Sequence, residues 1–364
     1  MRIQQLIQEI ENFAPLSYQE SYDNVGLLVG DAQTECKGVL FCLDCTEAVI
    51  DEAIAKNCNL IISHHPVIFS GLKKLNGKNF VERTVVKAIK NDVALYACHT
   101  NIDNVKEGVN AKIAEKLNLE NLSVLNAKSG ALKKLVTYVP PTHHQTLLDS
   151  LFEAGAGHIG QYSNCSFNIE GKGTFKGGDG TKPFIGKANE LSIESEIRIE
   201  TIFPAYLQTA VLTALFTNHP YEEVAYDIYQ LENKHLGVGS GALAECKEAC
   251  TESEFLSQLK DQFCIKNLKH SPFLGKKIKK VAICGGSGKF LMHDAIKAQA
   301  DVFITGDLKY HDYFEADGKI LLVDMGHYES EQFTPEIFYS IITNKFPTFA
   351  VHLSKVNTNP VNYF

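Results

Sequence analysis

A repeated alternation of short apolar segments with helix-like segments constrains the fold of this chain most. Residues 38–44, GVLFCLD, and residues 59–63, NLIIS, are strand-like, and residues 47–57 between them have a helical pattern that begins after Thr46 as N-cap. A second helical pattern then leads to another apolar run at residues 93–98. Because strands that alternate with helices form βαβ units, this part of the chain predicts a mostly parallel sheet in an α/β fold.

The C-terminal part of the chain repeats this pattern. Residues 279–307, KKVAICGGSGKFLMHDAIKAQADVFITGD, contain a strand, a helix and a strand, and residues 318–324, GKILLVD, form the next strand. In both parts a helix containing Ala-Ile leads to a short Asn-Leu or Asp-Val strand, and the next strand ends in a polar cluster. This similarity indicates an ancient duplication.

The middle of the chain has a different order of elements. Within residues 131–231 the pattern predicts strand, helix, strand, strand, helix and strand, which is the βαββαβ order of a ferredoxin-like module. A glycine-rich boundary, LGVGSG, follows at residues 236–241. We therefore predict one α/β domain made from residues 1–126 and 241–364, with an inserted ferredoxin-like α+β domain at residues 127–240.

Composition narrows the class of protein. Among 364 residues, 45% are hydrophobic and 21% are charged, which is typical of folded globular chains. The N-terminus lacks the pattern of a signal peptide, and no apolar stretch approaches the length of a membrane span, so no membrane association is expected. The ten cysteines lie mostly in apolar runs, as expected for reduced thiols in a cytoplasmic protein. The net charge of -8 makes nucleic acid an unlikely partner.

Two adjacent histidines, His64 and His65, follow the apolar run at residues 59–63 and precede Pro66. Neighbouring side chains of a regular strand point to opposite faces, so the two imidazoles could not share a target within the strand. Pro66 ends the strand geometry and places the pair in a loop at the carboxyl end of the strand, where parallel sheets hold ligands. A histidine pair alone is more typical of a hydrogen-bonded surface feature.

Further polar clusters at the ends of predicted strands favour a metal centre. These clusters are His99 to Asp103, Asp307 to Asp312 and Asp324 to Glu331. His327 and Glu331 are spaced i, i+4, which places both on one face of a helical turn. Imidazoles with carboxylates and no thiol are the ligands of zinc, manganese or iron. The candidate ligands are His64, His65, Asp103, His327 and Glu331. A single ion usually takes three or four protein ligands, so we expect two divalent ions bridged by a carboxylate and a water.

Other polar residues near the same strand ends are weaker candidates. His99 and His311 could orient ligands or act as catalytic proton shuttles, although each could equally be a hydrogen-bonded loop histidine. Asp23 and Asn24 lie in a turn and could cap backbone near the metals. Residues 284–290, CGGSGKF, could hold a phosphate, but their spacing favours a tight structural turn.

Five motifs of this chain, in this order, resemble those of the Nif-three-like family, whose members are called GTP cyclohydrolase 1 type 2 homologues: SYDNVGLLVG, ISHHPVIF, CHTNIDN, ITGDLKYHD and GHYESE. The resemblance runs nearly end to end, and the middle segment is similar to the PII-like and CutA-like insert of some bacterial members. It implies the same five metal ligands and a toroidal homohexamer with metal sites that face an internal cavity.

Two ions that share a water would produce a metal-bound hydroxide, which indicates a metal-dependent hydrolase. The family name implies attack on C8 of the guanine ring of GTP, and phosphoester hydrolysis of a nucleotide uses the same residues. The alternative is a non-catalytic, hexameric metal-binding scaffold or regulator with a PII-like module. A catalytic site keeps open positions on its metal, whereas a structural site is closed by protein ligands.

Overall fold

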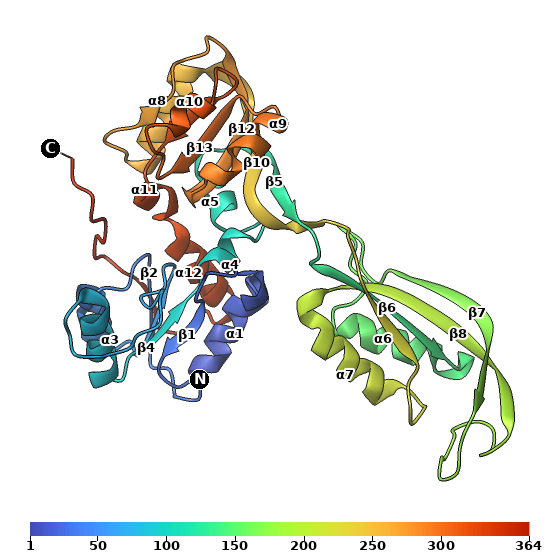
Figure 1. Cartoon of the computed structure of the whole chain (residues 1–364). Helices are drawn as coiled ribbons and strands as arrows, with labels where there is room; N and C mark the ends of the chain where they lie inside the picture. Colours follow the sequence, from blue (N-terminus) through green and yellow to red (C-terminus); the bar gives the residue numbers. More distant parts are fainter. Residues whose placement is uncertain (364) are drawn as a thin grey trace. The chain divides into compact units, whose positions relative to one another are not determined.

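The computed structural model of the chain describes residues 1–363 and divides into two compact units. Unit 1 combines Met1–Ala127 with the chain from Gly237 onward, and unit 2 is Lys128–Leu236. Figure 1 shows both ends of the chain, in blue and in orange to red, within unit 1. No helix in the described part of the chain is long and apolar enough to cross a membrane.

The first sheet of unit 1 is built from the N-terminal apolar runs and one strand from the C-terminal end. Its order is β1 (Gly26–Val29), β4 (Ala94–Ala97), β3 (Leu60–Ser63), β2 (Val39–Cys42) and β15 (Val351–Leu353). β15, β2, β3 and β4 are parallel, and β1 is antiparallel to β4. One face packs in a core with α1 (Ile3–Phe13) and α12 (Thr334–Lys345), and the other in a core with α2 (Glu47–Ala55) and α3 (Phe80–Lys90). Burial on both faces explains why these strands are continuously apolar.

The second sheet of unit 1 contains the C-terminal strands. Its order is β11 (Lys269–His270), β14 (Leu321–Asp324), β13 (Val302–Gly306), β12 (Lys277–Ser287), β10 (His235–Thr251) and β5 (Glu120–Lys128). β12, β13 and β14 are parallel, whereas β10 and β11 pair antiparallel to their neighbours β12 and β14. The remaining helices of unit 1 are α4 (Thr100–Asp103), α5 (Val109–Lys116), α8 (Glu252–Phe263), α9 (Met292–Lys297), α10 (Asp312–Glu315) and α11 (His327–Glu331).

The α/β class predicted from the sequence is confirmed, but the strands of unit 1 form two sheets instead of the single mostly parallel sheet that we expected. Each repeated segment pairs its own parallel strands, because a βαβ unit places its two strands in the same sheet. One core cluster contains residues of both sheets, including Phe41 and Ile283, together with Ile113 of α5 and Phe338 of α12. The strand-end clusters therefore come from two sheets that share a core.

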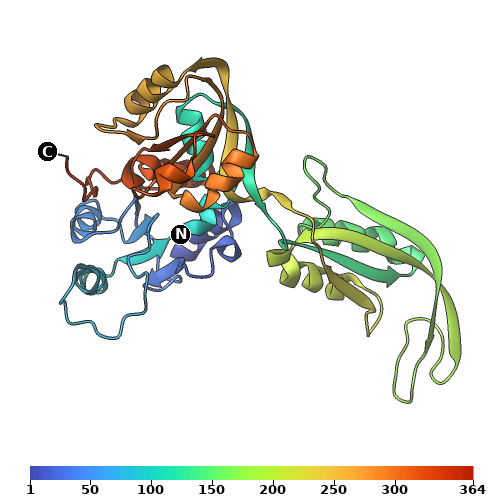
Figure 2. The ribbon, with the colours of Figure 1, turned by 45° about the horizontal axis from the view of Figure 1, so that its top comes forward.

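Unit 2 has the predicted order of elements. They are β6 (Leu132–Val139), α6 (His144–Glu153), β7 (Ser166–Lys176), β8 (Leu191–Pro204), α7 (Gln208–Asn218) and β9 (Tyr226–Gln230). The four strands form an antiparallel sheet in the order β7, β8, β6, β9. Side chains of α6 and α7 pack with Leu135, Ile199 and Phe203 in a separate core. Figure 2 shows the β7–β8 hairpin, in light green, extending beyond these helices.

Within residues 1–363, short 3₁₀ turns occur at four places: η1 (Leu16–Tyr18), η2 (Pro141–His143), η3 (Ala205–Leu207) and η4 (Lys289–Leu291). Three of them continue directly into a helix, since η2 precedes α6, η3 precedes α7 and η4 precedes α9. These turns lengthen the helical segments by one tighter turn at the N-terminal end.

Candidate metal centre

The five predicted ligands lie together in unit 1. His64 and His65 follow β3 directly, Asp103 ends α4, and His327 and Glu331 are the first and last residues of α11. The i, i+4 spacing places the side chains of His327 and Glu331 on one side of this short helix. Their side chains and those from the N-terminal half form groups of donor atoms within 4.8 Å of one another, which is close enough to hold a metal ion.

The carboxylate of Glu331 lies between two groups of donors. Its Oε1 is 3.6 Å from His64 Nε2, which is itself 3.7 Å from Asp103 Oδ1. Its Oε2 is 3.0 Å from His65 Nε2 and 3.1 Å from His327 Nε2, and these two nitrogens are 3.3 Å apart. Each carboxylate oxygen of Glu331 thus completes a set of three donors.

The outer nitrogen of each of these three imidazoles is held by an acceptor. His65 Nδ1 lies 2.7 Å from Asp44 Oδ1, and His327 Nδ1 lies 2.7 Å from Asp307 Oδ2. His64 Nδ1 lies 3.0 Å from the carbonyl oxygen of Cys98. These outer contacts orient each ring so that Nε2 points into the group, and a metal ion that replaced the proton on Nε2 would find each ligand already oriented.

Sequence reasoning missed two of these outer partners. Asp307 belonged to a predicted strand-end cluster but was given no role, and Asp44 was not considered. Both residues follow buried strands. Asp44 comes shortly after β2, and Asp307 comes directly after β13. An aspartate at the carboxyl end of a parallel strand beside a histidine cluster was the signal that could have identified them.

The electrostatics of the cluster separate the histidines. Burial lowers the pKa of His64 to about 4. Burial also opposes protonation of His65 and His327, but hydrogen bonds with Asp44 and Glu331 raise the pKa of His65 to about 10, and those with Glu331 and Asp307 raise the pKa of His327 to about 9. Burial would raise the pKa of Glu331, but the surrounding imidazoles hold this pKa well below its usual value.

Two buried atoms of the cluster lack a hydrogen-bond partner. His64 Nε2 and Asp103 Oδ1 face each other at 3.7 Å, and neither makes a hydrogen bond. Burial and the charge of Glu331 raise the pKa of Asp103 well above its usual value. Buried polar groups without a partner are costly, and a cation would satisfy both lone pairs at once. The residues present therefore fit a divalent metal ion.

A glycine makes room for the central carboxylate. A Cβ on Gly286, at the end of β12, would lie 2.3 Å from Oε1 of Glu331, and the residue has a φ of 61°. This glycine belongs to the segment CGGSGKF, which was considered for phosphate binding. The N–H groups of Gly285, Gly286 and Gly288 donate instead to Asn110, Ser330 and Thr305. The expected tight turn is instead the last part of β12, where its pairing with β13 shifts in register, followed by η4, and these three N–H groups already have acceptors within the protein.

His99 forms a further donor group with His64 and His65. Its ring centroid is 5.2 Å from that of His64 and 5.4 Å from that of His65, and its Nδ1 is 2.8 Å from Oδ1 of Asp23. Asp23 also accepts a hydrogen bond from the backbone N–H of Thr100. Burial would raise the pKa of Asp23, but its hydrogen bonds with His99 and Thr100 lower this pKa to about 2. Asp23 therefore holds His99 as an ionised partner.

The structure does not bring His311 into any of the donor groups. This residue is exposed at the N-terminus of α10, and its ring contacts those of Tyr310, at 5.2 Å, and Phe314, at 6.3 Å. Asn24, the other turn residue considered, donates from Nδ2 to the carbonyl of Ile68 and so ties its turn to the loop after the histidine pair.

The two-sheet architecture and the histidine–carboxylate cluster define an α/β protein with a candidate metal-binding centre. The sequence pattern described as Duf34/NIF3 (NGG1p interacting factor 3) matches residues 1–360, and the chain belongs to this family. A Bacillus subtilis protein named GTP cyclohydrolase 1 type 2 homolog is 40% identical over 365 residues, which cover 99% of this chain and 98% of the relative.

Solved structures share the fold over the whole chain. A Bacillus cereus protein related to NIF3 is 37% identical and superimposes with a TM-score of 0.88, covering 100% of this chain and 99% of the other. A Staphylococcus aureus protein is 32% identical with a TM-score of 0.79 and covers the same shares of the two chains. The family that the five motifs indicated is thereby confirmed.

Proposed function

We propose that the cluster binds two divalent metal ions and that the protein is a metal-dependent hydrolase. His64, Asp103 and Oε1 of Glu331 would hold one ion, and His65, His327 and Oε2 of Glu331 would hold the other. Zinc, manganese and iron suit this donor set. Such ions would act as Lewis acids and lower the pKa of a coordinated water.

The observation that carries this proposal is the position of Glu331. It is a buried carboxylate whose two oxygens face different donor sets, and this is the arrangement that a bridging ligand requires. Three protein donors for each ion would leave coordination positions for water and substrate. That number favours a catalytic centre over a closed structural site.

His99 is the residue of this chain best placed to move a proton. Its Nδ1 is bonded to Asp23, which fixes the ring, and the ring borders both His64 and His65. A general acid or base must reach the reacting atoms directly or through one water, and a ring beside the proposed ligands meets that condition. His311 is a weaker candidate because its ring lies outside the donor groups.

The name of the curated relatives supports a nucleotide as substrate. Either opening of the guanine ring of GTP or hydrolysis of a nucleotide phosphoester is compatible with the proposed centre. The βαββαβ order and the strand order of unit 2 support a ferredoxin-like module of the PII and CutA kind. A cytoplasmic, toroidal homohexamer is the proposed assembly, by the resemblance of the five motifs.

The test combines metal analysis with a turnover screen. The purified protein is analysed for zinc, manganese and iron, and is then assayed with GTP and with nucleotide phosphoesters before chelation, after chelation and after metal is added back. We expect about two ions per chain and turnover that disappears and returns with the metal. If the fully metallated protein turns over none of these compounds, the non-catalytic scaffold takes the place of the enzyme.

A further inference from the structure

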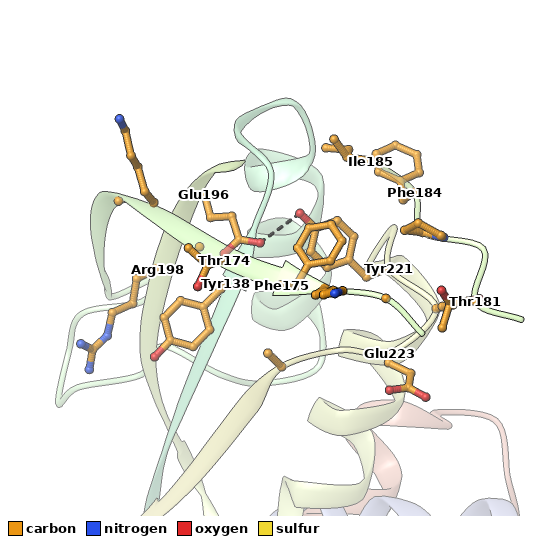
Figure 3. Close-up of a pocket in the computed structure, with 18 of the residues that line it drawn as sticks. Tyr138, Thr174, Phe175, Thr181, Phe184, Ile185, Glu196, Arg198, Tyr221 and Glu223 are labelled. Carbon is orange, nitrogen blue, oxygen red and sulfur yellow. Dashed lines mark hydrogen bonds between the residues drawn. The ribbon is translucent and has the colours of Figure 1, made fainter. Parts of the chain in front are cut away.

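A cavity lies in unit 2, away from the metal cluster in sequence. Its volume is about 700 Å³, and its lining comes from β6, β7, β8, the segment after β7 and the segment before β9. Cavities of roughly 300–1,000 Å³ are typical of small-molecule sites. Figure 3 shows the residues that surround it.

The floor of this cavity is bare strand backbone. Gly171 and Gly173 of β7 pair with Glu196 and Glu194 of β8, on the sheet face opposite to Ile197 and Ile199, which pack in the core with the helices. A Cβ added to Gly171 would meet no atom within 4 Å. Gly171 therefore leaves an open space on a strand surface that side chains usually fill, whereas the space over Gly173 holds the carboxylate of Glu196.

Aromatic rings form the walls. The ring of Tyr221 is 6.5 Å from that of Phe175 and 6.3 Å from that of Phe184, and Tyr138 of β6 also lines the cavity. The segment that carries Phe184 is attached to the rest of the unit by a hydrogen bond from the backbone N–H of Lys182 to Glu222. Figure 3 shows Phe184 and Ile185 beyond Tyr221 on the outer side of the cavity.

One carboxylate is fixed among these rings. The hydroxyl of Tyr221 donates to Oε1 of Glu196 over 3.0 Å. The other oxygen of Glu196 lies over Gly173, where an added Cβ would approach it to 1.9 Å. Three cationic residues also line the cavity, Lys172, Lys176 and Arg198. Of these, Arg198 pairs with Glu200 at 2.8 Å, and its guanidinium points away from Tyr221 (Figure 3).

We propose that this cavity binds a small organic cation that carries a planar group. Its N–H donors would bond to Glu196, and its planar part would pack against Phe175, Phe184 and Tyr221. Aromatic faces attract cations through their quadrupoles, and a carboxylate supplies the opposite charge. A small anion among the same rings would meet the negative charge of Glu196, so a cation is preferred at this position.

The charge requirement is tested with three compounds of the same shape. Benzamidine is cationic, benzamide is neutral and benzoate is anionic, and each is titrated into the full chain by isothermal titration calorimetry, with ligand-observed NMR for weak binding. We expect saturable binding of benzamidine, roughly tenfold or more weaker binding of benzamide, and none of benzoate. Equal binding of the three, tighter binding of benzoate, or no binding of benzamidine overturns the proposal.

Two variants and one control locate the binding. Gly171→Val should abolish benzamidine binding while the thermal unfolding curve is kept, because the new side chain enters open space in the cavity. Glu196→Gln keeps the shape and removes the charge, so it should weaken benzamidine about tenfold or more. Asn168→Val, on the same strand but on the opposite face and exposed, should leave benzamidine binding unchanged. Unchanged affinity in the folded Gly171→Val protein would place the binding elsewhere and refute the proposed site.

Discussion

Replacing Glu331 with glutamine should remove both metal ions together. The substitution keeps the shape of the side chain, so the fold is expected to persist, but it removes the one charge that both donor sets share. The Glu331 side chain is 3% exposed, and its oxygens lie 3.0 Å from His65 and 3.1 Å from His327. Removing one member of a buried charged pair costs about 3–5 kcal/mol. At about 1.4 kcal/mol per factor of ten, metal affinity should fall at least about a hundredfold.

The assay is elemental analysis of metal per chain after dialysis against buffered metal, with far-ultraviolet circular dichroism as a test of folding. Glu329→Gln is the matched control, because Glu329 lies on the same helix but bonds to Asn359. His64→Ala is a second comparison and should deplete mainly one of the two ions, since His64 contacts a single oxygen of Glu331. If folded Glu331→Gln protein keeps two ions with the affinity of the original chain, the bridging role is refuted.

Three further changes test the same centre. Asp44→Asn should weaken metal binding by roughly tenfold to a hundredfold, because Asp44 only orients His65 through a hydrogen bond to its Nδ1. This loss is smaller than the one expected for Glu331→Gln, and competition with a chelator measures it. Joining residue 127 to residue 237 by a short linker should keep metal binding, since the proposed ligands and their outer partners lie in unit 1, and a folded but metal-free product would contradict this. Because the pKa of His65 is about 10 and that of His327 about 9, both are protonated at pH 7 in the metal-free protein. Metal binding should therefore release about two protons and tighten as pH rises towards 9, which calorimetry in buffers of different ionisation enthalpy detects.

The same two pKa values give the metal-free fold a pH dependence of known sign. Both are raised above the value of about 6.5 that an unfolded chain would have. Protonation of His65 and His327 therefore stabilises the fold fully below about pH 6.5, and this contribution is lost as pH rises through about 9 and 10. Urea unfolding of chelated protein at several pH values measures it, and stability that rises over this alkaline range would contradict the assignment.

The sequence by itself determined the local elements and the residue types of the centre. The continuous apolar runs are strands because burial on both faces leaves no polar side. β3 ends at Ser63, so His64 and His65 lie in the loop before Pro66 as predicted, and the i, i+4 spacing places His327 and Glu331 on one side of α11. These are short-range relations, and covalent geometry and helix periodicity are sufficient to predict them.

Only the tertiary structure decided how these elements meet. Two sheets with a shared core place Glu331 against His64 and His65, more than two hundred residues away in the chain. The same packing selects Asp44 as the partner of His65 and leaves His311 outside the donor groups. The cavity of unit 2 likewise depends on Gly171 pairing with Glu196, which strand register sets. Such contacts depend on long-range packing, which periodicity along the chain does not encode.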